Sequence, residues 1–149
     1  MKRAFALLLT LCLLAALPAS GLPEAQEPVI ALDLSKMSGT VVYAQIYNLM
    51  YDPEPWLGKV IRMSGYYNYF NDTARGVVYH ACIVPDAAAC CTQGIEFVRA
   101  GTFTWPDDYP ALGDPITVTG RLEIYEENGV SYMHLTDADM VRDTDREGL

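Results

Sequence analysis

The chain has 149 residues, with 19 acidic side chains against 10 lysines and arginines, which gives a formal net charge of −9. Such an excess of acidic groups argues against a nucleic-acid partner, because phosphate backbones are bound mainly by clustered Lys and Arg. The length and a hydrophobic content of 51% fit one domain with a real core.

The first 20 residues have the pattern of a secretory signal peptide. Lys2 and Arg3 give a positive start, residues 4–16 are apolar apart from Thr10, and residues 17–21 supply a small-residue cleavage region. The apolar run is short for a membrane span. We therefore expect a secreted or cell-envelope protein with no membrane span after signal removal. Cys12 is lost with the signal, which leaves three of the four cysteines.

A short helix is predicted at the start of the mature domain. Residues 21–37 contain Pro23 and Pro28 and are expected to form a tether. Ser38 and Thr40 offer helix caps, and Val42, Ile46, Leu49 and Met50 follow at helical spacing. Prolines at 53 and 55 end the helix soon after Tyr51.

The hydrophobic period changes to two after Lys59, which predicts strands. They are expected at about 59–67, 76–84, 94–98, 116–125 and 130–135. Asn128–Gly129 predicts a type I′ hairpin turn between the last two, since both turn positions need positive φ. The domain is expected over 38–141, followed by a frayed acidic tail at 142–149.

These elements predict a mainly β fold, specifically a five-stranded antiparallel OB-like barrel preceded by one short helix. A generic β-sandwich is the alternative. One feature departs from the usual OB plan, in which a helix lies between the third and fourth strands. Residues 99–114 contain Pro106, Pro110 and Gly113 and have no helical period, and the helix here comes before the first strand.

The three remaining cysteines define a candidate site. Cys82 lies on the second predicted strand, and Cys90–Cys91 closes the loop that leads into the third. A hairpin connection is expected to bring Cys82 near the pair, and alternation places His80 on the same face as Cys82. Thiolate and imidazole ligands suit zinc or copper(I). A disulfide from Cys82 to Cys90 or Cys91 is the alternative, with thiol redox chemistry as the third interpretation.

Two segments carry a resemblance to known proteins. The sequence YDPEPWLGKVIRMSG at 51–65, followed by CCTQGIEF at 90–97, resembles a group of exported bacterial proteins of unknown function. The match covers roughly 42–137. It is more distantly similar to the extracytoplasmic region, containing adjacent cysteines, of a permease-subunit family. That resemblance implies a metal-related role, although this chain lacks membrane helices of its own, which those relatives have.

Three hypotheses for function follow. The first is a non-catalytic binding module with a cysteine-stapled hairpin and a protein partner at the cell envelope. The second is an extracytoplasmic metal-binding or metal-delivery protein that uses Cys82, Cys90, Cys91 and His80. The third is a thiol redox protein, although the sequence lacks a C-x-x-C at a helix start. His134 is interpreted as an ordinary rim histidine, and the ten tyrosines as strand formers rather than a stacking platform.

Overall fold

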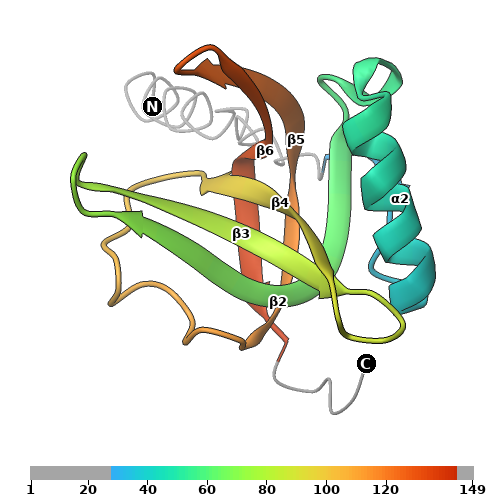
Figure 1. The fold of residues 1–149 in the computed structure, drawn as a ribbon, viewed down its shortest axis with the longest axis horizontal. Helices are drawn as coiled ribbons and strands as arrows, with labels where there is room; N and C mark the ends of the chain where they lie inside the picture. Colours follow the sequence, from blue (N-terminus) through green and yellow to red (C-terminus); the bar gives the residue numbers. More distant parts are fainter. Residues whose placement is uncertain (1–27, 144–149) are drawn as a thin grey trace, which may run out of the picture.

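The computed structural model describes residues 28–143, which form a mainly β structure with one α-helix and a six-stranded mixed sheet (Figure 1). The elements in chain order are β1 (Ile30–Asp33), α2 (Gly39–Tyr51), the 3-10 turn η1 (Glu54–Trp56), β2 (Val60–Asp72), β3 (Val77–Pro85), β4 (Thr92–Arg99), β5 (Pro115–Glu127) and β6 (Val130–Arg142). The predicted signal peptide, residues 21–27 of the predicted tether and residues 144–149 of the predicted tail lie outside the described residues.

The strands pair in the order β1-β2-β3-β4-β6-β5, and β2 also pairs with β5. Two of these pairings, β1 with β2 and β4 with β6, are parallel. The prediction of five strands in an all-antiparallel arrangement was therefore wrong in strand number and in direction. Alternation within a strand indicates which side chains share a face, but it carries no information on the direction of the neighbouring strand.

The predicted local elements are present where the sequence placed them. The helix begins after Ser38 and ends at Tyr51. Each of the five predicted strands overlaps one of β2 to β6, although β6 runs seven residues further than predicted, to Arg142. Asn128 has φ 52° and Gly129 has φ 78°, as a type I′ turn requires. The 99–114 connection contains no helix.

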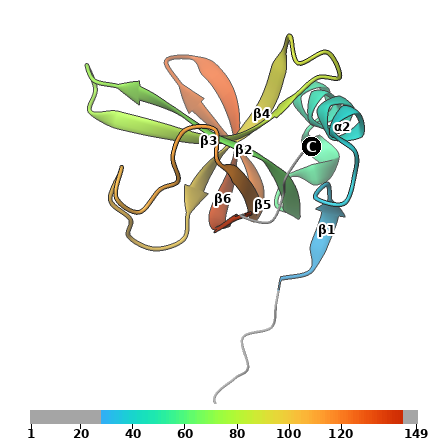
Figure 2. The ribbon, with the colours of Figure 1, turned by 90° about the horizontal axis from the view of Figure 1, so that it is seen from below.

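The sequence did not predict β1, which lies inside the expected tether. It has only four residues, IALD, and they pair with the start of β2. Directly after it, Leu34 is completely buried. Figure 2 shows β1 and α2 on the same side of the molecule, away from the turn between β2 and β3.

One apolar core joins the sheet to the helix. Its helical part is Val42, Ile46 and Leu49, whose spacing of three and four residues puts them on one face of α2. The sheet contributes buried side chains from every strand after β1: Ile61, Met63, Tyr67, Cys82, Val84, Ile95, Phe97, Ile116, Val118, Leu122, Leu135, Ala138 and Met140. Among the described residues, no helix has the length and apolar character needed to cross a membrane.

Candidate functional site

The structure separates the residues that the sequence grouped into one site. His80 and Cys82 lie on β3, whereas Cys90 and Cys91 lie in the loop before β4. Cys82 is opposite Ile95, and it lies three residues before Pro85, which is opposite Thr92. At about 3.3 Å per residue this places Cys82 roughly 10 Å from the loop along the strand, beyond the ~7 Å between Cα atoms that a disulfide tolerates. The expected approach of Cys82 to the pair therefore does not occur.

Cys82 is instead a core residue. Its side chain is 0% exposed and packs against β2 at Gly65, where an added Cβ atom would lie 3.0 Å from the Cys82 sulfur and 2.4 Å from the Ile83 carbonyl oxygen. Burial raises the pKa of the Cys82 thiol to about 12. Cys82 is therefore neutral and inaccessible, which suits a packing role more than ligation.

His80 lies two residues before Cys82 on β3 and is surrounded by aromatic neighbours. Its Nδ1 is 2.7 Å from the Tyr67 hydroxyl, and its ring stacks on Tyr109 with centroids 3.8 Å apart. Burial, and to a lesser degree the charge of Arg99, lowers the pKa of His80 to about 4. Burial also raises the pKa of Tyr67 to about 12. Near neutral pH an uncharged imidazole is therefore hydrogen-bonded to an un-ionised phenol.

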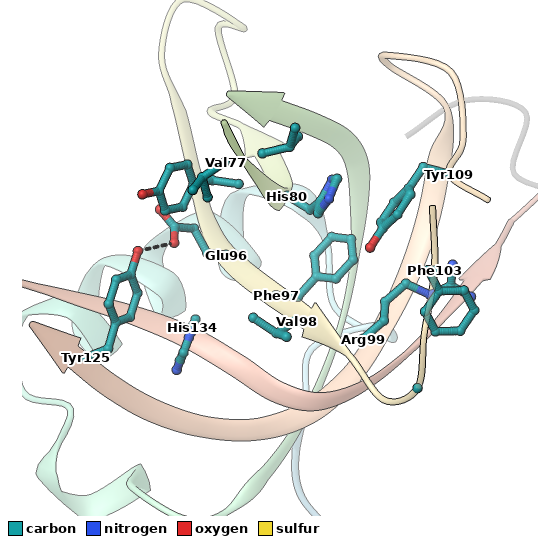
Figure 3. A pocket seen from close by; sticks show the side chains of 13 residues that line it. Val77, His80, Glu96, Phe97, Val98, Arg99, Phe103, Tyr109, Tyr125 and His134 are labelled. Atoms are coloured by element: carbon teal, nitrogen blue, oxygen red, sulfur yellow. Dashed lines mark hydrogen bonds between the residues drawn. The ribbon is translucent and has the colours of Figure 1, made fainter. Parts of the chain in front are cut away.

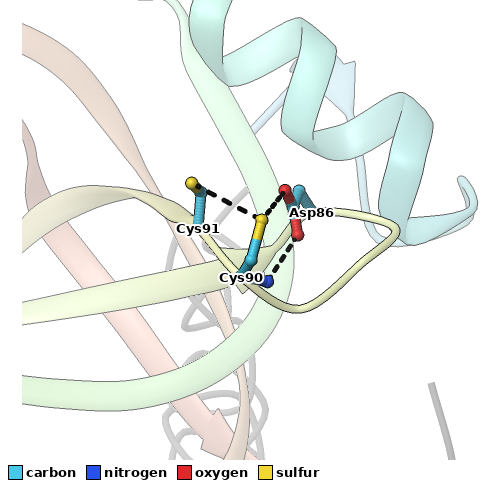
Figure 4. A group of neighbouring side chains, drawn as sticks. All are labelled: Asp86, Cys90 and Cys91. Atoms are coloured by element: carbon cyan, nitrogen blue, oxygen red, sulfur yellow. Dashed lines mark hydrogen bonds between the residues drawn. The ribbon is translucent and has the colours of Figure 1, made fainter.

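The loop between β3 and β4 brings together a second set of groups (Figure 4). One ligand atom each from Asp86, Cys90 and Cys91 lies within 4.8 Å of the others. The Cys90 thiol donates to Asp86 Oδ2 at 3.2 Å, and the two sulfurs are 3.8 Å apart. Hydrogen bonding to Asp86 raises the pKa of Cys90, and the same bond lowers the pKa of Asp86. All three cysteines of the described chain are free, and the loop pair is exposed.

A groove of about 490 Å³ lies at the end of the β3–β4 hairpin opposite this loop (Figure 3). Strands β3, β4, β5 and β6 and the 99–114 connection all contribute to it. Its lining residues are Val77, Val78, Tyr79, His80, Glu96, Phe97, Val98, Arg99, Gly101, Phe103, Tyr109, Tyr125 and His134. Three apolar members are exposed: Val77 is 37%, Val98 is 55% and Phe103 is 38% accessible.

Hydrogen bonds between side chains fix one wall of this groove. The Tyr125 hydroxyl donates to Glu96 at 2.6 Å, and the Tyr125 ring lies 4.7 Å from that of His134. The Tyr79 hydroxyl donates to Glu127 at 2.9 Å. Arg75, in the turn between β2 and β3, forms an ion pair with the same carboxylate. This tie of Arg75, Tyr79 and Glu127 joins the β2–β3 hairpin to the end of β5.

The 99–114 connection forms the opposite wall. The Arg99 guanidinium lies 3.4 Å from the centre of the Phe103 ring and donates to the Asp108 carbonyl at 2.9 Å. The Asp108 carboxylate accepts the amide of Thr104 at 2.7 Å, and Arg142 donates to the Tyr109 carbonyl at 2.9 Å. These bonds hold Tyr109 against His80, so this wall is preformed.

Strand β3 continues into the groove beyond its pairing with β4. The last paired residues are His80 and Phe97, whereas the other edge of β4 pairs with β6 from Glu96 to Arg99. Residues 77–79 pair with β2 on one side. On their other side, no strand of the described chain pairs with them, and they line the groove instead. The groove therefore contains a short free strand edge next to exposed apolar side chains.

Sequence reasoning missed this groove because its residues come from five segments between 77 and 134. His134, interpreted as a rim histidine, is one of them. Searches against family models, curated proteins and solved structures gave no match to the chain.

Proposed function

We propose that the protein is a non-catalytic binding module that works outside the cytoplasm and binds an extended segment of a partner protein in the groove. The free edge of β3 at residues 77–79, inside an apolar groove, carries this proposal. An added strand pairs its main chain with such an edge, and the pockets beside the edge select its alternate side chains. The signal-like segment at 1–20 and the resemblance to exported proteins support the location.

The groove offers both parts of that recognition. The backbone groups of every second residue in 77–79 point away from β2, toward a side where no strand of the described chain pairs with them. Val77, Val98 and Phe103 supply exposed apolar surface on either side. An extended peptide with apolar side chains fits this surface. Its main chain can pair with the free edge of β3, and its side chains can cover Val77, Val98 and Phe103.

The rings of the groove favour this ligand over a stacked sugar or base. His80 stacks on Tyr109, and Arg99 covers the ring of Phe103. Tyr125 is flanked by Tyr132 and His134, with centroids 5.4 Å and 4.7 Å away. A stacking platform needs open ring faces, and much of this ring surface already has a partner.

The side chains that titrate in the groove are also engaged with one another. Glu96 accepts a hydrogen bond from the Tyr125 hydroxyl, and His80 shares a hydrogen bond with the Tyr67 hydroxyl. Groups tied up in this way make a rigid wall, which favours binding over proton transfer.

We further infer that the strands form the OB-like barrel expected from the sequence, now with β1 added outside it. The run β2-β3-β4-β6-β5 returns to its first strand through the β2–β5 pairing, which is what a closed five-stranded ring requires. In OB-folds the second and third strands form the binding face. Here these are β3 and β4, the two strands that diverge at the groove.

Peptide selection on the immobilised protein tests the proposed function. Short peptides are selected from a random library, and their affinities are measured by fluorescence polarisation. Val98→Asp should weaken binding by about tenfold or more, because it places a charge in the apolar groove. Val141→Asp is the matched control, since Val141 is equally exposed at 55% and lies outside the groove on β6.

Backbone methylation of the selected peptides separates strand addition from simple apolar contact. N-methyl groups at alternate positions remove amide donors, and one of the two alternating registers should abolish binding while the other leaves it intact. Peptides that bind wild type and Val98→Asp equally, or that tolerate methylation in both registers, would show that the groove does not bind in this way. Failure of the library to yield any binder would do the same.

A further inference from the structure

The loop between β3 and β4 gathers three donor groups at the surface. Asp86, Cys90 and Cys91 are the described side chains whose ligand atoms approach within 4.8 Å, and both thiols are exposed. The loop lies beside α2 in Figures 1 and 2, at the opposite end of the hairpin from the groove. It is therefore a separate feature, and nothing in the proposed groove uses it.

The two spacings from Cys90 to the other donors are close to the edges of a tetrahedral metal site. Two thiolates bound to one zinc ion at about 2.3 Å lie roughly 3.8 Å apart if the geometry is tetrahedral. The sulfurs of Cys90 and Cys91 are 3.8 Å apart. A sulfur and a carboxylate oxygen on the same ion would lie about 3.5 Å apart, and Cys90 Sγ is 3.2 Å from Asp86 Oδ2.

A tight backbone turn makes this convergence of adjacent cysteines possible. On an extended strand, Cys90 and Cys91 would point to opposite faces. Ala89 instead has a positive φ of 53°, which turns the chain just before the pair. The Asp86 carboxylate accepts the Cys90 amide at 2.9 Å, and the Asp86 amide donates to the Cys91 carbonyl at 2.9 Å. The donors are thus positioned by the loop itself.

We propose that Asp86, Cys90 and Cys91 form an open site for a divalent ion of the zinc class. Binding replaces the S–H bonds with two zinc–sulfur bonds and releases the thiol protons to solvent. Three protein ligands leave one tetrahedral position for water or for a donor from another molecule, as in zinc sites that are not closed structural ones. The carboxylate favours zinc over copper(I), which prefers an all-sulfur set.

This donor set differs from the one expected from the sequence. Cys82 is buried about 10 Å away along β3. His80 lies further along the same strand, in the groove. The new member is Asp86, which the fold holds beside Cys90. The site is exposed and one-sided, so a bound ion can exchange without unfolding of the domain.

Zinc titration of the full chain tests the site. The protein is reduced, its thiols are counted, and Zn²⁺ alone is titrated by calorimetry in competition with a chelator. Co²⁺ substitution reports sulfur ligation by its thiolate-to-metal charge-transfer absorption. Wild type should bind one ion per chain. Cys90→Ser and Cys91→Ser should each weaken zinc by about tenfold or more and reduce the Co²⁺ band, while Asp86→Asn should weaken zinc without removing the band.

Two variants serve as controls. Cys82→Ala removes a thiol outside the site, and Asp107→Asn removes an exposed loop carboxylate; circular dichroism checks that each is folded. Both should bind zinc as wild type does. The proposal is overturned if reduced wild type binds no zinc. It is also overturned if binding survives in the Cys90→Ser/Cys91→Ser double variant, or if Cys82→Ala alone abolishes it.

Discussion

At one end of the β3–β4 hairpin, side chains are held by packing, whereas at the other end they are held by hydrogen bonds within a solvent-exposed loop. His80 is half-buried and lies between Tyr67 and Tyr109. Cys90 and Cys91 are exposed, and an Asp86-centred turn orients them. The same pair of strands therefore carries a rigid apolar surface and a chemically accessible thiol pair, so the two ends are expected to respond to different perturbations.

Thiol accessibility should show the largest difference between the core and the loop. In native, reduced, metal-free protein, iodoacetamide should modify Cys90 and Cys91, while Cys82 should react at least about a thousandfold more slowly, because it is fully buried and reacts only when the structure opens. Intact mass against time gives the rates. Three thiols that react at similar rates would contradict the assignment of Cys82 to the core.

Close packing around Cys82 should make Gly65→Ala strongly destabilising. The added Cβ would lie 2.4 Å from the Ile83 carbonyl oxygen, so β2 and β3 must separate, at a cost of about 2–4 kcal/mol in the free energy of unfolding. Urea denaturation measures this. Gly39→Ala is the control, since a Cβ added at Gly39 would have no other atom within 4 Å, and it should cost nothing. Equal effects in the two variants would show that the approach of the strands is not tight.

The groove end should make stability depend on pH. Folded His80 takes up a proton only near pH 4, whereas unfolded histidine does so near 6.5. Between these values the unfolded chain binds more protons, so stability should fall as the pH drops from 6.5 to 4. The loss should stay below about 2 kcal/mol, because solvent screens a half-buried ring.

The variant His80→Phe isolates this contribution. It keeps an aromatic ring against Tyr109 and removes the titrating group. Urea denaturation at several pH values should give a shallower fall in stability for His80→Phe than for wild type between pH 6.5 and 4. Identical pH profiles would mean that the burial of His80 does not perturb its titration.

Substitution of Asp86 in the β3–β4 loop should have the smallest effect on stability but a clear effect on the reactivity of Cys90. Asp86→Asn should change the free energy of unfolding by less than about 0.5 kcal/mol, since the loop is at the surface. It should also speed alkylation of Cys90 near neutral pH, because the Asp86 carboxylate raises the pKa of that thiol. Peptide mapping after brief alkylation measures the rate at Cys90. An unchanged rate would show that Asp86 does not control the thiol.

The sequence predicted those parts of the fold that depend on local pattern. Helical spacing in Val42, Ile46 and Leu49 predicted α2, and the Asn128–Gly129 pair predicted its turn. The parallel pairing of β4 with β6 was missed, because strand direction is set by how the 99–114 connection crosses the molecule. β1 was missed because the alternation of Ile30, Leu32 and Leu34 is very short and lies in a segment that was interpreted as a tether.

The candidate sites show the same limit. The distance of Cys82 from Cys90 and Cys91 depends on the register of the β3–β4 hairpin. In the structure Cys82 pairs with Ile95, and the spacing of cysteines in the sequence does not reveal this register. The turn that makes Cys90 and Cys91 converge depends on positive φ at Ala89, a residue type that gives no turn signal. The groove collects residues from distant segments, so only the tertiary structure brings them together.

The tie of Arg75, Tyr79 and Glu127 has a consequence for the surroundings in which the groove operates. Its charged members lie at the surface, where salt screens attraction over about 8 Å at 0.15 M. The ion pair between Arg75 and Glu127 is therefore weaker at high salt concentration than at low salt concentration. Raising the ionic strength therefore weakens the charged part of the link between the β2–β3 hairpin and the end of β5.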